Sequence, residues 1–323
     1  MSLLLQKPGI LTTVQDLGRN GYRRFGVNPG GAMDRAAARL INILLGNDDN
    51  EALLEMHFPA AELLFEAKAT FAVGGGDFSP KLDGDAIENW RPMAAKKGST
   101  LRFGGKASGN RAYLAVAGGF RLENWLGSSG TNLAAQIGGI DGRKLDAGDR
   151  LGFRKKTGKN KSVDSRRIST SILPLYSRFP TVRIIAGPEV QSLDKRGRAS
   201  LVNHDFSILN NSNRMGFRLS GEPISLSKPI EMISSAVGFG TIQLLPDGQM
   251  IVLMADHQTT GGYPRVAHVI SHDLPLLAQL GAGDKVAFHL IEASEAEELA
   301  LEFERELSFF RIGCKFQAQS WAS

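Results

Sequence analysis

A chain of 323 residues with 42% hydrophobic and 22% charged residues has the composition of an ordinary globular protein. Its length exceeds what one hydrophobic core usually supports, and its formal net charge of +5 is modest, so we expect two domains and no dedicated nucleic-acid surface. No run approaches the roughly 18 apolar residues of a membrane span, and a single cysteine, Cys314, excludes an internal disulfide and a cysteine-built metal cluster. Because the N-terminus lacks the pattern of a secretory signal, we expect a cytoplasmic protein.

Short apolar runs bounded by turn residues indicate a mainly β fold. The chain has 37 glycines, many of them in pairs between these runs, and helical periodicity is scarce. The runs that predict strands are 61–65, 70–73, 100–103, 112–116 and 150–153 in the first half, and 181–186, 206–209, 241–245, 251–255 and 285–291 in the second. Many short strands at this spacing favour barrels or sandwiches.

Two segments break this β pattern. Residues 34–45 carry apolar side chains at helical spacing and end at Gly46, which predicts one core-facing helix. The glycine-rich loop 26–34 precedes it, and free N–H groups at a helix N-terminus can receive an anion, which makes Asp34 a candidate binding residue. No P-loop is present, because Lys106 and Lys159 are not followed by Ser or Thr. Residues 295–310 predict a second, amphipathic helix.

A basic segment separates the two strand-rich halves. Residues 154–167 contain seven basic residues against one acid and little to bury. With no aromatic platform or nucleic-acid module around it, this segment is typical of a solvated connection. We therefore expect an N-terminal lobe over 1–160, a basic linker over 161–178, a C-terminal lobe over 179–292, and a helix and tail over 293–323.

The densest polar motif directly follows a predicted buried strand, 250–255. It places Asp256, His257, Gln258, Thr259 and Thr260 before a pair of glycines and a Tyr-Pro pair at 263–264. A site at the end of a rigid strand is well positioned, although such polar groups also cap barrel corners. A weaker echo of the motif lies in residues 12–22, which suggests two related loops that share a cleft.

Two further polar patterns have structural alternatives. Residues 211–218 combine Arg214 and Arg218 with an amide-rich turn, which suits bidentate capture of a carboxylate, and structural salt bridging explains the pattern equally well. His268 and His272 are spaced like metal ligands on a helix turn, but a third ligand is missing and Pro275 follows. We predict no metal site.

The stretches 11–34, 111–119, 211–219 and 241–264 together resemble the KipA family. This family, also called allophanate hydrolase subunit 2 or PxpC, the third component of 5-oxoprolinase, is related to the biotin-dependent carboxyltransferase domain of urea carboxylase. The resemblance implies tandem cyclophilin-like β-barrels with a few helices. It also implies ATP-dependent opening of 5-oxoproline to glutamate, with ATP and Mg bound in a complex with a smaller, homologous KipI-like partner and a LamB/YcsF-like partner. A small-molecule substrate is implied, and neither a membrane nor a nucleic acid.

The resemblance also assigns expected roles to the polar motifs. Asp256, Arg214 and Tyr263 are the expected catalytic residues, with Asp256 orienting or deprotonating water, Arg214 stabilising developing negative charge, and Tyr263 forming a pocket wall. The expected substrate-binding residues are Asp16, Arg19, Tyr22, Asp34, Gln258, Thr259 and Thr260.

The chain departs from the family pattern at Asn213, Gly30 and the pair Ser234 and Ser235, and each departure changes the polarity expected of the site. No Met-Lys pair occurs, so biotin is not expected on this chain. The alternatives are a carboxyltransferase component for urea or a similar amide, with biotin carried elsewhere, and a non-catalytic regulator of a kinase inhibitor.

Overall fold

The computed structural model describes residues 1–154, 166–228 and 230–320. The chain forms two compact units, each assembled from separate segments. Unit 1 comprises Met1–Arg19, Gly30–Pro174 and Glu304–Ser323, and unit 2 comprises Asn20–Pro29 and Leu175–Phe303. Most of the basic segment predicted as a linker, 155–165, lies outside the described residues.

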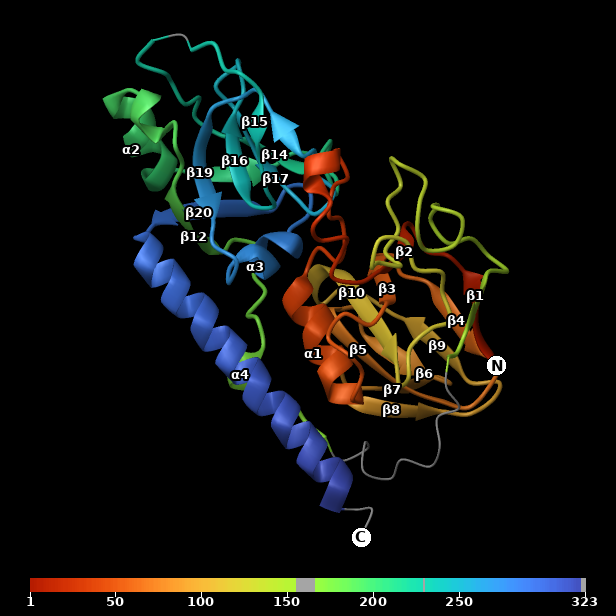
Figure 1. The fold of residues 1–323 in the computed structure, drawn as a ribbon. Coiled ribbons are helices and arrows are strands. Elements are labelled where there is room, and N and C mark those ends of the chain that lie inside the picture. Colours follow the sequence, from red (N-terminus) through yellow and green to blue (C-terminus); the bar gives the residue numbers. More distant parts are fainter. Residues whose placement is uncertain (155–165, 229, 321–323) are drawn as a thin grey trace. The chain divides into compact units, whose positions relative to one another are not determined.

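In the described part of unit 1 the strands form two sheets (Figure 1). The first sheet has the order β11 (Arg150–Gly152), β1 (Ser2–Lys7), β4 (Glu62–Phe65), β9 (Thr100–Phe103), β6 (Pro80–Leu82) and β7 (Asp85–Ala86). The second has the order β2 (Thr12–Gln15), β3 (Leu53–His57), β10 (Ser108–Val116), β5 (Ala69–Asp77) and β8 (Pro92–Ala95). Their alternating apolar residues share one hydrophobic core, in which Leu3, Leu63, Phe71 and Leu114 have no exposed surface.

Helix α1 (Arg35–Leu45) packs against the second sheet of unit 1 (Figure 1). Its apolar face contacts side chains of β3, β5 and β10, because Ile41 and Leu44 join one buried cluster with Leu53, Ala72 and Ala115. A left-handed Gly46 ends the helix, as the sequence predicts.

Unit 2 is built on a closed barrel. Its strands follow the order β12 (Thr181–Ala186), β19 (Arg265–Val269), β16 (Thr241–Leu244), β17 (Met250–Leu253), β14 (Gly216–Ser220), β13 (Asp205–Ile208) and β20 (Lys285–Leu290). Alternate residues of each strand are buried, as a filled barrel interior requires. The pairs Phe217 and Leu219 of β14 and Ile242 and Leu244 of β16 show this pattern.

Shorter elements complete the fold. A ribbon of β15 (Ser235–Ala236) and β18 (Thr260–Gly261) forms beside the barrel. The remaining helices are α2 (Lys195–Asn203), α3 (Leu274–Ala278) and α4 (Ala293–Ser320), with short 3-10 turns η1 (Arg23–Phe25), η2 (Thr170–Ile172) and η3 (Val190–Ser192). Within the described residues, no helix is both long and apolar enough to cross a membrane.

The mainly β architecture with few helices is confirmed, and so is a closed barrel in the second half of the chain. The first half differs from a second closed barrel, because its described strands hydrogen-bond as two separate sheets. Apolar runs alone could not distinguish these arrangements, since closure depends on which strand edges pair.

Candidate functional site

A pocket of about 470 Å³ opens on unit 2. Strands β14, β16 and β17 contribute its floor, while the loop before β14, the turn between β16 and β17 and the polar motif contribute its walls. Its lining residues are Asn211, Asn213, Met215, Gly216, Arg218, Gln243, Leu245, Pro246, Asp247, Ile251, Leu253, Gln258 and Tyr263. The volume lies within the range of about 300–1,000 Å³ that is usual for small-molecule sites.

Strand alternation places this pocket on the outer face of the barrel. Phe217 and Leu219 fill the interior, so the intervening Arg218 faces outward. Pairing aligns Arg218 with Ile251 across β14 and β17, and Ile251 with Gln243 across β17 and β16. The pocket floor therefore carries a guanidinium, an apolar side chain and an amide in one row.

Gln243 holds the polar motif against this floor. Its side chain is buried, and its Nε2 donates to the Tyr263 carbonyl oxygen at 3.3 Å. Its Oε1 accepts from Gln258 Nε2 at 3.5 Å. A Cβ at Gly261 would lie 2.5 Å from Gln243 Nε2, so only glycine allows this close approach. Gln243 was not predicted as a site residue, and its signal was a lone amide in an otherwise apolar strand.

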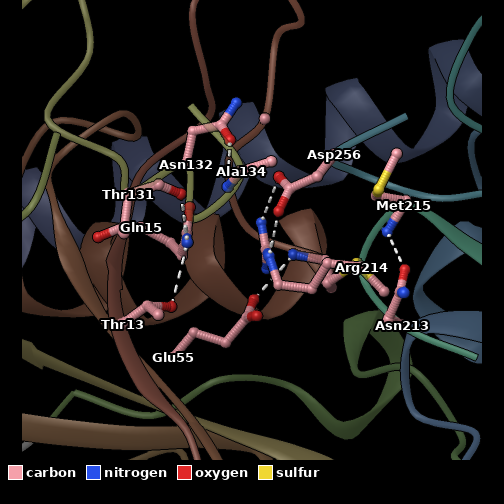
Figure 2. A network of polar contacts seen from close by, with 12 residues as sticks. Thr13, Gln15, Glu55, Thr131, Asn132, Ala134, Asn213, Arg214, Met215 and Asp256 are labelled. Atoms are coloured by element: carbon pink, nitrogen blue, oxygen red, sulfur yellow. Dashed lines mark hydrogen bonds and ion pairs between the residues drawn. The ribbon is translucent and has the colours of Figure 1, made fainter. Parts of the chain in front are cut away.

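The amide-rich turn before β14 shapes the opposite wall. Asn213 Oδ1 accepts from the Met215 N–H at 2.8 Å (Figure 2), and the Asn213 N–H donates to the Gly216 carbonyl oxygen at 3.1 Å. This local turn fixes the Asn213 amide at the pocket edge. The family departure at Asn213 thus lies in the lining of the pocket.

The two arginines of this segment have different surroundings. Arg214 forms a buried fork with Asp256, in which Nε donates to Oδ2 at 2.8 Å and Nη2 donates to Oδ1 at 3.0 Å (Figure 2). Arg218 is exposed to the pocket, and within the described residues its guanidinium has no carboxylate partner. Salt bridging therefore accounts for Arg214, whereas Arg218 is accessible to a ligand.

The loop that carries Asp256 is tied down from two directions. The Asp256 N–H donates to the Arg214 carbonyl oxygen at 2.8 Å, and Asn28 Nδ2 donates to the Asp256 carbonyl oxygen at 3.0 Å. Arg23 also donates to the Val237 carbonyl oxygen, so the segment Asn20–Pro29 is anchored on unit 2. Tyr22 lies in this segment as the half-buried residue before η1.

The two threonines of the motif lie outside the pocket lining. Thr260 pairs with Ala236 in the β15–β18 ribbon, and the Thr259 carbonyl oxygen accepts from the Val237 N–H at 3.2 Å. Ser235, where the family pattern departs, pairs with Gly261. A substrate-binding role for the threonines stays a prediction.

In unit 1, Asp16 and Arg19 organise the loop that contains Ser128, Ser129 and Gly130. Asp16 accepts from the Ser128 hydroxyl at 2.7 Å and from the Ser129 N–H at 2.6 Å. Arg19 is buried, donates to the Gly130 carbonyl oxygen and stacks 5.4 Å from the Trp125 ring. These contacts support the loop structurally, and a role in substrate binding stays a prediction.

Asp34 caps helix α1 and connects it to a buried network. Its carboxylate accepts from the Ala37 N–H at 2.9 Å, and its own N–H donates to the Tyr113 hydroxyl at 2.9 Å. That hydroxyl donates to Glu55 at 2.9 Å, and Glu55 also accepts from the Met33 N–H at 2.8 Å. Burial, with Glu55 beside it, holds the pKa of Tyr113 well above its ordinary value, so the hydroxyl remains a donor.

Among the residues that the structure describes, no group of three His, Cys, Asp or Glu side chains is arranged to hold a metal ion. His268 lies in β19, where its Nδ1 is 3.2 Å from the Thr241 hydroxyl, and burial lowers its pKa. His272 lies in the turn before α3 beside Asp273. The two histidines are therefore not neighbours on a helix turn.

The fold and the pocket define a mainly β protein whose barrel presents an amide-lined pocket on its outer face. Residues 25–290 match the family described as carboxyltransferase domain, subdomain A and B. The chain belongs to this family.

Its relatives include two bacterial proteins of similar length, both of them the 5-oxoprolinase subunit designated C. It is 38% identical over 287 residues to the relative from Haemophilus influenzae, covering 89% of this chain and 90% of the relative. It is 34% identical over 319 residues to the relative from Escherichia coli, covering 98% and 100% of the two chains.

A crystal structure of the K. lactis urea amidolyase matches with a TM-score of 0.89 and 28% sequence identity. That alignment covers 96% of this chain and 20% of the urea amidolyase chain, so this chain spans about a fifth of that protein.

Proposed function

We propose that this chain is one subunit of an ATP-dependent 5-oxoprolinase, which opens 5-oxoproline to glutamate together with partner subunits. The observation that carries the proposal is the match over nearly the whole of both chains to the 5-oxoprolinase subunit of Escherichia coli. The pocket supports it, because an accessible guanidinium and several amides suit a substrate that is both a carboxylate and a lactam.

The chemistry of lactam opening explains why ATP and partners are needed. A five-membered lactam is a stable amide, and transfer of the ATP γ-phosphoryl group to its oxygen activates the ring carbon while ADP leaves. Water then adds to that carbon, the ring C–N bond breaks to release the amine, and a second water displaces phosphate to leave glutamate. We propose that ATP with Mg binds in the assembled complex with KipI-like and LamB/YcsF-like subunits.

Within this chain, Asp256 and Arg214 are proposed to act as a unit. Each Asp256 oxygen keeps a lone pair beyond the one that Arg214 occupies, so the carboxylate can still orient a water. Gln258 and Tyr263 are proposed to contact the substrate directly, since both line the pocket. We further propose that the two units derive from the cyclophilin-like barrels that the family resemblance implies.

A carboxyltransferase role toward urea is a second candidate, favoured by the similarity to urea amidolyase. The two functions separate in one assay. The chain, reconstituted with the subunits encoded beside it, is supplied with ATP and either 5-oxoproline or urea with a biotin-carrier protein. Glutamate formed from 5-oxoproline supports the first function, whereas biotin-dependent consumption of urea without glutamate supports the second.

A further inference from the structure

We propose that Arg218 anchors the substrate carboxylate in the outer-face pocket, while Asn213 and Gln258 bind the two sides of the lactam amide. The inference rests on the proposed function and deepens it. It assigns the pocket a ligand class, namely a small cyclic amide that carries one carboxylate.

The carboxylate end of the pocket is set by Arg218. Its neighbour Arg214 already uses its guanidinium on Asp256, with both atoms of the carboxylate bound. Arg218 lies in the pocket lining, and in the described part of the chain no carboxylate pairs with it. A planar guanidinium with free N–H groups binds a carboxylate in a bidentate fork.

The amide end has a donor and an acceptor in place. Asn213 uses its Oδ1 on the Met215 N–H, so its NH₂ group remains to donate to a lactam oxygen. Gln258 directs its Nε2 to Gln243, so its Oε1 remains to accept from a lactam N–H. These two groups complement a lactam, which has one acceptor and one donor.

The spacing of the two ends matches one small ring. Arg218, Ile251 and Gln243 lie in one row on three adjacent strands, so the backbones of the outer two are roughly 10 Å apart. Between the polar ends the floor is apolar, with Ile251 and Leu253, and Tyr263 stands at the wall. The ring methylenes of the ligand would pack on this apolar strip.

Asp247 provides an internal check on the electrostatics. It shares the lining with Arg218, and its carboxylate accepts from the Gln249 N–H at 3.0 Å. A negative charge at this position opposes a bound carboxylate. Asp247→Asn keeps the turn hydrogen bond and removes the charge, so it should tighten binding several-fold.

The test measures 5-oxoproline binding to the purified full chain by titration calorimetry or ligand-observed NMR. Arg218→Gln should weaken binding about 10- to 100-fold, the range for losing hydrogen bonds to a charged group, and Arg218→Lys should lie between it and the wild type. For 2-pyrrolidinone, which lacks the carboxylate, Arg218→Gln should change nothing. Arg305→Gln removes an exposed arginine of α4 outside the pocket and serves as the matched control.

The same variants are then assayed in the reconstituted complex, where Arg218→Gln should raise KM for 5-oxoproline. Unchanged binding and unchanged KM in Arg218→Gln would overturn the pocket assignment and leave the proposed function standing. Loss of binding in Arg218→Gln, in a complex that does not form glutamate, would support the pocket and contradict the proposed function.

Discussion

The ion pair between Arg214 and Asp256 is the most buried charge interaction of the polar motif, with the two side chains 6% and 7% exposed. Burying two charges is costly, and the fork geometry offsets that cost only while both partners are present. The pair also joins the loop before β14 to the loop after β17. Its loss should therefore weaken the fold and displace the neighbouring pocket wall.

We expect Asp256→Asn to lower the free energy of unfolding by roughly 3 kcal/mol, because the buried Arg214 loses the carboxylate charge that its fork binds. In the reconstituted complex the rate should also fall by about 10²- to 10⁴-fold, measured well below the unfolding temperature. Urea unfolding of the full chain gives the stability. The double variant Arg214→Met with Asp256→Leu should recover part of the stability and none of the rate. Wild-type stability in Asp256→Asn would show that the ion pair contributes nothing to folding.

A second buried carboxylate makes stability depend on pH. Burial opposes the charge of Asp273, but hydrogen bonds from Arg183 and His272 outweigh it and lower the pKa of Asp273 to about 2. A pKa below the ordinary 3.8 stabilises the fold above about pH 4, and this contribution is lost as the pH falls toward 2.

Asp273→Asn should therefore cost about 2 kcal/mol at pH 6, and the difference from the wild type should shrink toward zero near pH 2. Chemical unfolding at a series of pH values measures this. Asp205→Asn removes a carboxylate from an exposed pair with Lys285 and is the control, with little expected effect. A pH-independent difference for Asp273→Asn would contradict the charge argument.

At the residue scale, the sequence identified the pocket segment but could not separate Arg214 from Arg218. Both arginines suit carboxylate capture, and which one meets Asp256 depends on the register between β14 and β17. Gln258 and Tyr263 were predicted as site residues and do line the pocket. Asp247 and Gln243 were not predicted, because they enter the pocket through strand pairing that residue order does not specify.

At the element scale, strands with uninterrupted apolar runs were predictable and those with buried polar residues were not. The predicted segments 100–103 and 181–186 coincide with β9 and β12. Strand β3 was missed because Glu55 and His57 interrupt its apolar pattern. Glu55 is buried there to anchor the loop before α1, a function that requires the tertiary contact with Tyr113.

This anchor should be sensitive to one hydroxyl. Tyr113→Phe removes the donor to Glu55 and the acceptor for the Asp34 N–H, leaving two buried polar groups short of a partner. We expect a loss of roughly 2 kcal/mol in unfolding free energy. Tyr263→Phe, which removes an exposed hydroxyl, should leave stability unchanged and is the matched control. Equal stability of the two variants would show that the network does not hold the α1 loop.

At the scale of the whole molecule, the discontinuous units were beyond prediction from the sequence. The C-terminal half of α4 belongs to unit 1 through contacts distant in sequence, in which Arg39 pairs with Glu304 and Arg311 with Asp49. Helical periodicity predicted the face of α4 that carries the buried Leu307, but not its partner. Long-range ion pairs of this kind leave no local pattern.

The central claim is that this chain is one subunit of a 5-oxoprolinase. The most direct measurement is ATP-dependent glutamate formation from 5-oxoproline by the chain alone, by the partner subunits alone, and by all of them together. We predict glutamate, with matching ADP formation, in the complete mixture alone. Turnover near about 1 to 10 s⁻¹ by the isolated chain, or full activity of the partners without it, would contradict the account.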